Sequence, residues 1–389
     1  MSQSFPALGV SAPVTRELAS RGIVEAFPIQ ELALPDALAG HDVLAKSPTG
    51  SGKTLAFGLP IVERVDADAT VPAALVLVPT RELALQVSDE LSRLAAPKGL
   101  RVATVYGGAP LGAQAKEARA AHVLVATPGR LQDLDDRRLV SLDSIAVLVL
   151  DEADRMLDMG FRPQVERIVR RLPKARQTML FSATLDGEVG ELARTFTRNP
   201  SRFEADLAPA NGDAAVDHAF VSVTAGDKLD RLVEVLGAER GLALVFVRTK
   251  RGADRLAKKL KERGVDAAAM HGDMTQRARE RALERFRSGR TTTLVATDVA
   301  ARGLDLESIS HVINFDPPED DKGYVHRVGR TGRAGRAGQG ITLVLPEQQA
   351  DVSRVAARLG HKEQFESSGM NTARPKLLYT SRRGRNSRW

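Results

Sequence analysis

The sequence has no cysteine, few aromatic residues and no long apolar run, and each absence excludes a class of protein. Without cysteine among its 389 residues, the chain forms neither disulfides nor thiolate metal sites, as is typical of a reducing compartment. Aromatic residues make up 4%, so the core must be aliphatic. The longest apolar runs, such as Ile145 to Leu150, fall short of the ~20 residues of a membrane span. The start of the sequence lacks a secretory signal, and we expect a cytoplasmic protein.

Positive charge is concentrated in one segment. The formal net charge is +7, and six basic residues with no acidic residue lie in residues 371–389, which leaves about +1 for the rest. A basic, disordered tail of this kind is typical of an arm that binds nucleic acid. The alternative is a solvated terminus that only aids solubility.

Short aliphatic runs alternate with helix-like segments along the chain, among them residues 82–95, 250–263 and 276–287. Because these runs do not alternate with polar residues, we expect strands buried on both faces, as in parallel sheets covered by helices. The predicted fold class is therefore α/β and doubly wound. The runs are residues 74–78, 123–125, 147–150, 179–181, 242–247, 293–295, 311–313 and 341–345.

A composition break divides the chain into two similar halves. Residues 207–214 are rich in proline, asparagine, glycine and alanine without periodicity, which predicts a linker. We expect an N-terminal domain at 1–206 and a C-terminal domain at 215–370. No short-period repeat is present, and the seven histidines show no metal-ligand spacing.

A glycine-rich loop follows a further strand-like stretch at residues 42–45. In SPTGSGKT, residues 47–54, backbone N–H groups of the loop can point at phosphate oxygens at a helix N-terminus. Lys53 would reach the β and γ phosphates, and the Thr54 hydroxyl would bind Mg²⁺. The first position departs from the usual glycine, since it is Ser47. The alternative is an ordinary glycine-serine turn before a helix.

An acidic cluster, DEAD at 151–154, ends the aliphatic run 147–150. Ligands of open parallel sheets bind beyond the carboxyl ends of the strands, so this run would deliver Asp151 to the site. Asp151 fits as a Mg²⁺ partner through water, because Mg²⁺ dehydrates reluctantly. Glu152 is then placed to activate the attacking water. Alone, such a run would more often be a solvated face.

From residue 5 to residue 345 the chain resembles the DEAD-box ATP-dependent RNA helicases of superfamily 2, of the compact bacterial, RhlE-like kind. The motifs occur in order: GIVEAFPIQ (22–30), the phosphate loop, PTRELA (79–84), TPGR (127–130), DEAD, SAT (182–184), ATDVAARGLD (296–305) and HRVGRTGR (326–333). The resemblance implies two tandem RecA-like domains that use ATP and Mg²⁺ to unwind short RNA duplexes or remodel RNA–protein complexes.

The resemblance also implies a nucleotide site. Gln30 would read the adenine edge and Phe5 would stack on the base, while Phe27 stands where threonine or serine is usual. Asp305 would contact the ribose. The phosphate loop would contribute Ser47, Thr49, Gly50, Ser51, Gly52, Lys53 and Thr54.

RNA contacts and coupling groups are implied in the same way. RNA would be held through its backbone, without base readout. Ser182 and Thr184 would bond the acidic motif through Asp154. The RNA-binding residues would be Arg81, Gly107, Gly108, Thr127, Arg130, Gln276, Arg279 and Thr297. Taken singly, several of these motifs could equally be helix caps or turns.

Catalysis would be divided between the halves. The resemblance makes Arg330 and Arg333 arginine fingers, with His326 and Arg327 joining the water and the acidic motif. Arg248 stands where asparagine or cysteine is usual and receives no role. We expect a monomer, with ribosome-assembly or RNA-decay proteins as candidate partners. Two alternatives remain: a DNA helicase or translocase, and an ATP-dependent RNA clamp with little unwinding.

Overall fold

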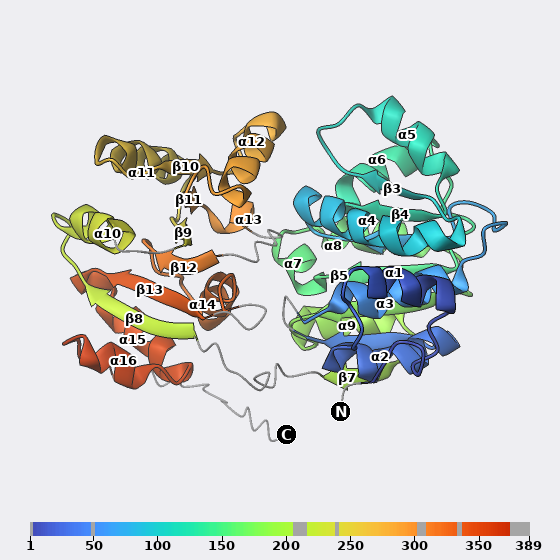
Figure 1. Cartoon of the computed structure of the whole chain (residues 1–389), viewed down its shortest axis with the longest axis horizontal. Coiled ribbons are helices and arrows are strands. Elements are labelled where there is room, and N and C mark those ends of the chain that lie inside the picture. The colour runs from blue at the N-terminus through green and yellow to red at the C-terminus, as the bar shows by residue number, and fades with distance from the viewer. Residues whose placement is uncertain are drawn as a thin grey trace, which may run out of the picture. The chain divides into compact units, whose positions relative to one another are not determined.

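The computed structural model describes residues 3–47, 51–204, 216–237, 241–301, 309–332 and 337–373, without the side chains of residues 276, 299 and 322. The chain divides into two compact units, and among the described residues the first ends at 204 and the second begins at 216 (Figure 1). The predicted linker, 207–214, and the tail from 374 lie outside the described residues. No helix of the described part is both long and apolar enough to cross a bilayer.

The first unit is a seven-stranded sheet in the order β3-β4-β2-β5-β6-β1-β7, with every pair parallel. Its strands are β1 Val43–Lys46, β2 Ala74–Leu77, β3 Val102–Val105, β4 Val123–Ala126, β5 Val147–Asp151, β6 Gln177–Ser182 and β7 Ser201–Glu204. Its helices are α1 Ala12–Ser20, α2 Pro28–Ala39, α3 Lys53–Arg64, α4 Arg81–Ala95, α5 Leu111–Ala120, α6 Pro128–Asp136, α7 Ala153–Asp158, α8 Arg162–Arg171 and α9 Gly187–Phe196.

The second unit is a six-stranded parallel sheet in the order β10-β11-β9-β12-β13-β8. Its strands are β8 Val216–Ser222, β9 Leu242–Phe246, β10 Ala267–Met270, β11 Thr293–Ala296, β12 Ile309–Asn314 and β13 Gly338–Val344. Its helices are α10 Lys228–Gly237, α11 Lys250–Glu262, α12 Gln276–Arg287, α13 Asp298–Ala301, α14 Asp321–Val328, α15 Gln349–Arg358 and α16 Lys362–Ser367. The predicted parallel α/β class is confirmed for both units.

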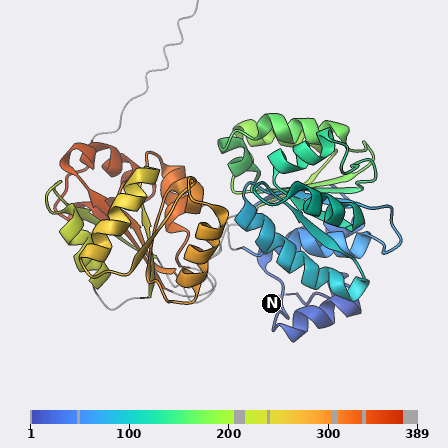
Figure 2. The ribbon, with the colours of Figure 1, turned by 90° about the horizontal axis from the view of Figure 1, so that it is seen from above.

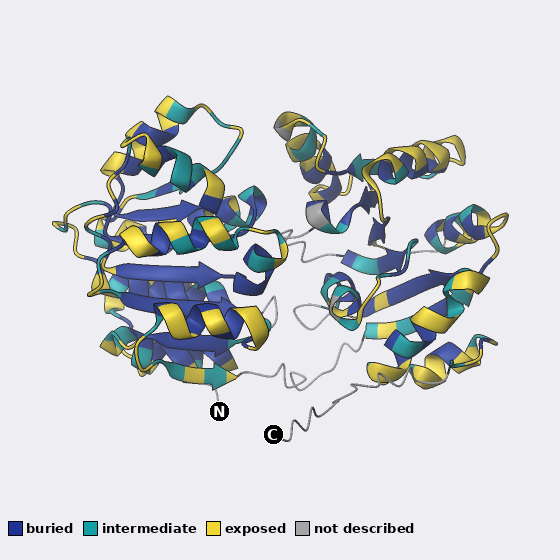
Figure 3. Cartoon of the chain, turned by 180° about the vertical axis from the view of Figure 1, so that it is seen from behind, coloured by how far each residue is buried: buried dark blue, intermediate teal, exposed yellow. Residues whose placement is uncertain are grey.

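Each sheet is covered by helices on both faces, as Figure 2 shows, and the strand sequences explain why. In β5, Val147 and Val149 pack with α1–α4, whereas Leu148 and Leu150 pack with α5–α9. Side chains alternate between faces, so the apolar run supplies both cores at once. Figure 3 accordingly shows the central strands as buried and the outer sides of many helices as exposed.

Threonine caps recur where strands turn into helices. The Thr80 hydroxyl accepts the Leu83 N–H at 3.3 Å, and the Thr249 hydroxyl accepts the Gly252 N–H at 3.0 Å. Both threonines therefore satisfy a helix N–H that would otherwise lack a partner. The alternative that PTRELA forms a helix cap is thus correct for Thr80. The neighbouring Arg81 side chain takes no part in this cap.

A stacked histidine pair joins β8 to the C-terminal helices of the second unit. The rings of His218 and His361 lie 3.7 Å apart between centroids at 24°, and His218 Nδ1 is 2.9 Å from the Tyr324 hydroxyl. Burial, then the neighbouring His361, lowers the pKa of His218 to about 4, while Asp217 acts in the opposite direction. Burial also lowers the pKa of His361. The pair therefore favours the neutral state.

We predict that this pair makes the second unit sensitive to acid. An unfolded histidine binds its proton near pH ~6.5, whereas folded His218 binds it only at about 4. Stability is therefore full above the unfolded pKa and falls as the pH drops between the two values. Chemical denaturation in acid and at neutral pH measures how much free energy of unfolding is lost in acid. This loss should be smaller for His218→Gln than for the parent. The exposed His41 is the control: His41→Gln should lose as much as the parent. Equal losses for all three would contradict the prediction.

Candidate functional site

The phosphate loop begins at the carboxyl end of β1 and ends where α3 begins. Ser47 is fully buried, and its N–H donates to the Ser182 carbonyl at 2.9 Å. The Lys53 ammonium donates to the Ser47 carbonyl at 3.1 Å, and the Ser47 and Ser51 hydroxyls are hydrogen-bonded. Lys53 therefore lies folded across the loop. Thr49 and Gly50 lie outside the described residues.

The acidic motif lies at the carboxyl end of β5. Asp151 is 3% exposed, and the Glu152 N–H donates to its Oδ1 at 2.9 Å. Burial raises the pKa of Asp151 to about 6, Lys53 opposes that shift, and Glu152 adds to it. Asp151 is therefore a buried carboxyl with incomplete charge compensation, close enough to Lys53 to feel its charge.

Ser182 connects the two motifs. It ends β6, which lies between β1 and β5 in the sheet. Its hydroxyl accepts the N–H groups of Asp154 and Thr184, both at 3.3 Å, and its carbonyl accepts the Ser47 N–H. The structure thus brings SAT against the acidic motif, through the Asp154 backbone. Asp154 Oδ2 is buried without a hydrogen-bond partner in the described part of the chain.

Gln30 is also tied to the phosphate loop. Its Oε1 accepts the Phe27 N–H at 2.9 Å, and its Nε2 donates to the Gly52 carbonyl at 2.9 Å. Phe27 itself is 55% exposed, whereas Phe5 is 1% exposed within the core. The stacking predicted for Phe5 would require this ring to be uncovered. Phe27 is the exposed aromatic residue beside the loop.

The donor groups fit a Mg²⁺–nucleotide complex. Mg²⁺ in such sites uses one or two carboxylates together with phosphate oxygens, and the raised pKa of buried Asp151 indicates a carboxyl that a nearby cation would stabilise as the anion. Thr54 is the second residue of α3, immediately after Lys53. No group of three or more histidine or acidic side chains suited to a metal occurs in the described ranges, and none is required for this mode of binding.

The predicted RNA residues of the first unit gather at the same edge of the sheet, beyond β2, β3 and β4. The Arg81 guanidinium lies against Gly107 and Gly108, and a Cβ added at Gly108 would collide with its Nη1. Arg130 donates to the Ala109 carbonyl and to Gln114 Oε1, both at 2.9 Å. Thr127 is 8% exposed, and its N–H donates to the Val105 carbonyl. Two arginines thus converge on the loop after β3.

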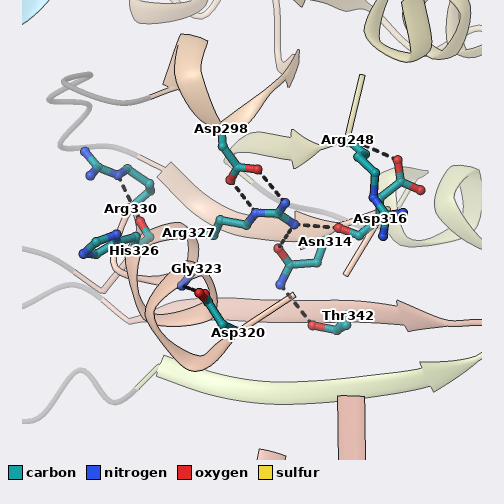
Figure 4. A network of polar contacts seen from close by, with 10 residues as sticks. All are labelled: Arg248, Asp298, Asn314, Asp316, Asp320, Gly323, His326, Arg327, Arg330 and Thr342. Carbon is teal, nitrogen blue, oxygen red and sulfur yellow. Dashed lines mark hydrogen bonds and ion pairs between the residues drawn. The ribbon is translucent and has the colours of Figure 1, made fainter. Parts of the chain in front are cut away.

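In the second unit, the buried guanidinium of Arg327 is the centre of a polar network (Figure 4). Its Nε and Nη2 donate to both oxygens of Asp298 at 2.6 and 2.7 Å. Its Nη1 donates to Asn314 Oδ1 at 3.2 Å and to the Asp316 carbonyl at 2.6 Å. Arg327 is 5% exposed. The guanidinium therefore joins α14 to α13 and to the end of β12, within one unit.

Some of the other residues of the second unit that the sequence singled out lie next to this network, and others lie apart from it in α12. Thr297 directly precedes Asp298 and is 7% exposed, and Arg330 is 4% exposed with its Nε donating to the His326 carbonyl at 3.3 Å. The Arg248 N–H donates to Asp316 Oδ2 at 2.9 Å. Arg279 lies in α12, which Gln276 begins. Asp305, Arg333 and the side chain of Gln276 lie outside the described residues.

Sequence reasoning gave no role to several residues that the structure places at the site. Gln114, Asn314 and Asp298 hold predicted functional arginines. Arg155 donates to Glu152. Asp298 and Arg155 stand inside or next to recognised motifs, which could have marked them. Gln114 and Asn314 carry no local signal, because each meets its arginine only through the fold.

The class of protein follows from three features: a buried lysine on a glycine-rich loop, an acidic strand end beside it, and two parallel sheets. Together they define a phosphate-loop nucleotide hydrolase with tandem RecA-like units. The chain matches the family model of the DEAD/DEAH box helicases over residues 27–192, and that of the helicase conserved C-terminal domain over residues 227–335. The chain belongs to the DEAD-box ATP-dependent RNA helicases.

Comparison with individual relatives supports the same family. The chain is 45% identical over 346 residues to the DEAD-box ATP-dependent RNA helicase CshA of Streptococcus pneumoniae, covering 88% of this chain and 66% of the relative. It is 40% identical to CshA of Geobacillus kaustophilus, covering 96% and 79%. The structure of S. cerevisiae Dbp5 bound to RNA and ADP BeF3 matches with a TM-score of 0.81 at 33% identity, covering 96% of each chain. The chain thus spans about two thirds of the pneumococcal relative, and the RhlE-like subtype stays a prediction.

We predict that Gly52 must remain glycine for nucleotide binding. Its φ is +83°, and an added Cβ would lie 2.5 Å from Gln30 Nε2 and closer still to the Phe27 ring. Gly52→Ala should therefore push Gln30 and Phe27 off the loop and weaken ATP binding by at least ~10-fold, equivalent to ~1.4 kcal/mol. Calorimetric titration with ATP measures this.

Gly22→Ala is the matched control for this prediction. Gly22 also has positive φ, +74°, but an added Cβ there would meet nothing within 4 Å. It shares the backbone strain without the collision, so ATP affinity should stay close to that of the parent. Equal ATP affinity for the two variants would contradict our account of the loop.

We predict that the Arg327 network stabilises the second unit far more than a similar exposed pair does. Arg327→Met leaves Asp298, Asn314 and the Asp316 carbonyl without their donor, which should lower the free energy of unfolding by ~3 kcal/mol. Arg358 makes the same two-pronged contact with Asp321 at 2.7 and 2.8 Å, but its side chain is 54% exposed. Arg358→Met should cost only about 0–1 kcal/mol. Denaturant titration compares them, and similar losses would refute the prediction.

Proposed function

We propose that this chain is an RNA-stimulated ATPase that locally unwinds short RNA duplexes or remodels RNA–protein complexes. The observation that carries the proposal is the position of Ser182. Its carbonyl accepts from Ser47 of the phosphate loop, and its hydroxyl accepts from Asp154 of the acidic motif. One strand end thus holds the two halves of a Mg²⁺–ATP site together, at the edge where Arg81 and Arg130 converge.

Residues of the first unit carry out the chemistry in this proposal. Lys53 would hold the β and γ phosphates, Thr54 and Asp151 would hold Mg²⁺, and Gln30 would recognise the adenine. Mg²⁺, when bound, would neutralise phosphate charge and polarise the terminal phosphoryl group. Glu152 accepts a proton from water as the water oxygen bonds to the terminal phosphorus. The bond from that phosphorus to the bridging oxygen breaks, and ADP leaves.

The second unit supplies the remaining groups. We assign Arg330 and Arg333 as arginine fingers for the terminal phosphoryl group, with His326 beside them and Asp305 on the ribose. Thr297, Gln276 and Arg279 hold RNA together with Arg81, Gly107, Gly108, Thr127 and Arg130 of the first unit. In this proposal the two units close around ATP and RNA for hydrolysis. Because each ligand would favour the closed arrangement, each should tighten binding of the other by the same factor.

RNA would be bound without strong sequence preference, since these groups suit phosphate and sugar rather than base edges. The basic residues after 373 would add affinity that falls with salt. A cytoplasmic monomer with ribosome-assembly or RNA-decay partners fits this proposal. Matched RNA and DNA duplexes in a strand-separation assay distinguish it from a DNA helicase. RNA-stimulated phosphate release distinguishes it from a clamp without turnover.

Two substitutions test the proposed chemistry. Lys53→Ala removes the cation that meets the phosphates, and Glu152→Gln removes the proton acceptor. Each should reduce RNA-stimulated phosphate release by ~10²–10⁴-fold. Glu152→Gln should still bind ATP and RNA, because it keeps the size and polarity of the side chain. Phosphate release and equilibrium binding are measured on the same samples.

Lys174, an exposed lysine of the first unit, is the control for charge loss. Lys174→Ala should release phosphate at the parental rate. If Glu152→Gln also hydrolysed ATP at the parental rate, Glu152 would not be the group that activates water.

A further inference from the structure

The carboxylate proposed to activate water is held by a buried arginine. Arg155 Nη1 donates to Glu152 Oε2 at 2.5 Å. The side chains of Arg155 and Glu152 are 3% and 5% exposed. Arg155 lies in α7, three residues after Glu152, and its own N–H donates to Asp154 Oδ1 at 3.0 Å. Arg155 thus contacts two members of the acidic motif.

The backbone at Glu152 is a sharp turn from strand to helix. Glu152 has φ +53° and ψ +48°, the left-handed region that non-glycine residues rarely adopt and that costs about 1–2 kcal/mol. β5 ends at Asp151 and α7 begins at Ala153. The turn therefore brings the first turn of α7, with Arg155, back over the carboxylate of the residue that precedes the helix.

Stability alone does not account for this pair. Removing a guanidinium and a carboxylate from water costs several kcal/mol for each ion, and an apolar pair of similar volume is often as stable or more so. The left-handed turn adds a further cost. The arrangement is thus costly in two ways, and it occurs at the residue that would meet the attacking water. This favours a role for Arg155 in positioning Glu152.

We propose that Arg155 is a positioning residue that fixes the Glu152 carboxylate for activation of the attacking water. The inference rests on the proposed function, in which Glu152 takes the proton from water. Arg155 holds one carboxylate oxygen, so the side chain cannot rotate away from its position beside Asp151. It touches neither ATP nor RNA in this role and acts only through Glu152.

The test compares Arg155→Met and Arg155→Lys in the full chain by kcat, KM for ATP, and affinity for ATP and for a single-stranded oligoribonucleotide. Arg155→Met removes this hold on the carboxylate, so kcat should fall ~10²-fold, a loss that a misplaced reacting group can cause. KM and both affinities should stay within ~3-fold, because no binding group is lost. Arg155→Lys keeps a donor and should recover kcat to within ~10-fold of the parent.

A double substitution checks that Arg155 acts through Glu152. If Arg155 acts only through Glu152, adding Arg155→Met to Glu152→Gln should slow turnover no further, because two residues that act through the same group do not have additive effects. Arg231 provides the control, because it makes an ion pair of the same i,i+3 spacing, in the reverse order, with Glu234 at 2.6 Å and with both side chains exposed. Arg231→Met should keep the parental kcat.

Three results would overturn the inference: an unchanged kcat in Arg155→Met, an equal loss of kcat and of both affinities, or no recovery by Arg155→Lys. Each is distinct from failure of the proposed function. That failure would appear as normal turnover in Glu152→Gln, whatever Arg155→Met does. If Glu152→Gln is inactive while Arg155→Met is normal, only the positioning role is lost.

Discussion

The parallel pairing of β6 between β1 and β5 is the constraint on which the first unit's site depends. The register aligns Lys46 with Ser182 and Asp151 with Phe181, so the three strands end at nearly the same level. A phosphate loop, a serine hydroxyl and a pair of carboxylates therefore meet at one edge of the sheet, where the Ser182 hydroxyl accepts the Asp154 N–H. A slip of one residue would reverse the faces of every side chain in β6 and remove Ser182 from both neighbours.

The same strands explain how the site is held rigid. In β1, β2, β4 and β5 the face packed by α1–α4 is formed mainly by valine and alanine, and the face packed by α5–α9 mainly by leucine. A strand with a core on each side cannot tilt without disturbing both. The polar groups at its end are thus fixed by packing before any ligand binds, as preorganised sites require. The scarcity of aromatic residues makes both cores aliphatic.

Local patterns in the sequence predicted the elements well and their non-local partners poorly. The helices expected at 82–95, 250–263 and 276–287 agree with α4, α11 and α12 within one residue at each end. The motif chemistry placed Ser47 and Asp151 at strand ends because buried runs precede them. Burial of Phe5, and the contact of Gln114 with Arg130, could not be read from spacing, because each depends on which distant residues the fold brings alongside. Arg155 was within reach of sequence reasoning, but an arginine after an acidic run is usually solvated.

Electrostatics complete the explanation of the acidic motif. Asp151, Glu152 and Asp154 are each less than 5% exposed, and such charges are tolerated only when paired. Arg155 pairs with Glu152, and Lys53 opposes the rise in the pKa of Asp151 without cancelling it, since that pKa remains at about 6. Asp154 Oδ2 has no hydrogen-bond partner in the described part of the chain, which costs about 1–3 kcal/mol. The motif is thus paired with a cation at Glu152, incompletely compensated at Asp151, and left with one oxygen of Asp154 that has no hydrogen-bond partner in the described residues. This pattern is what a site needs if its water-activating carboxylate is to stay fixed while its other carboxylates keep capacity for groups that arrive with the nucleotide.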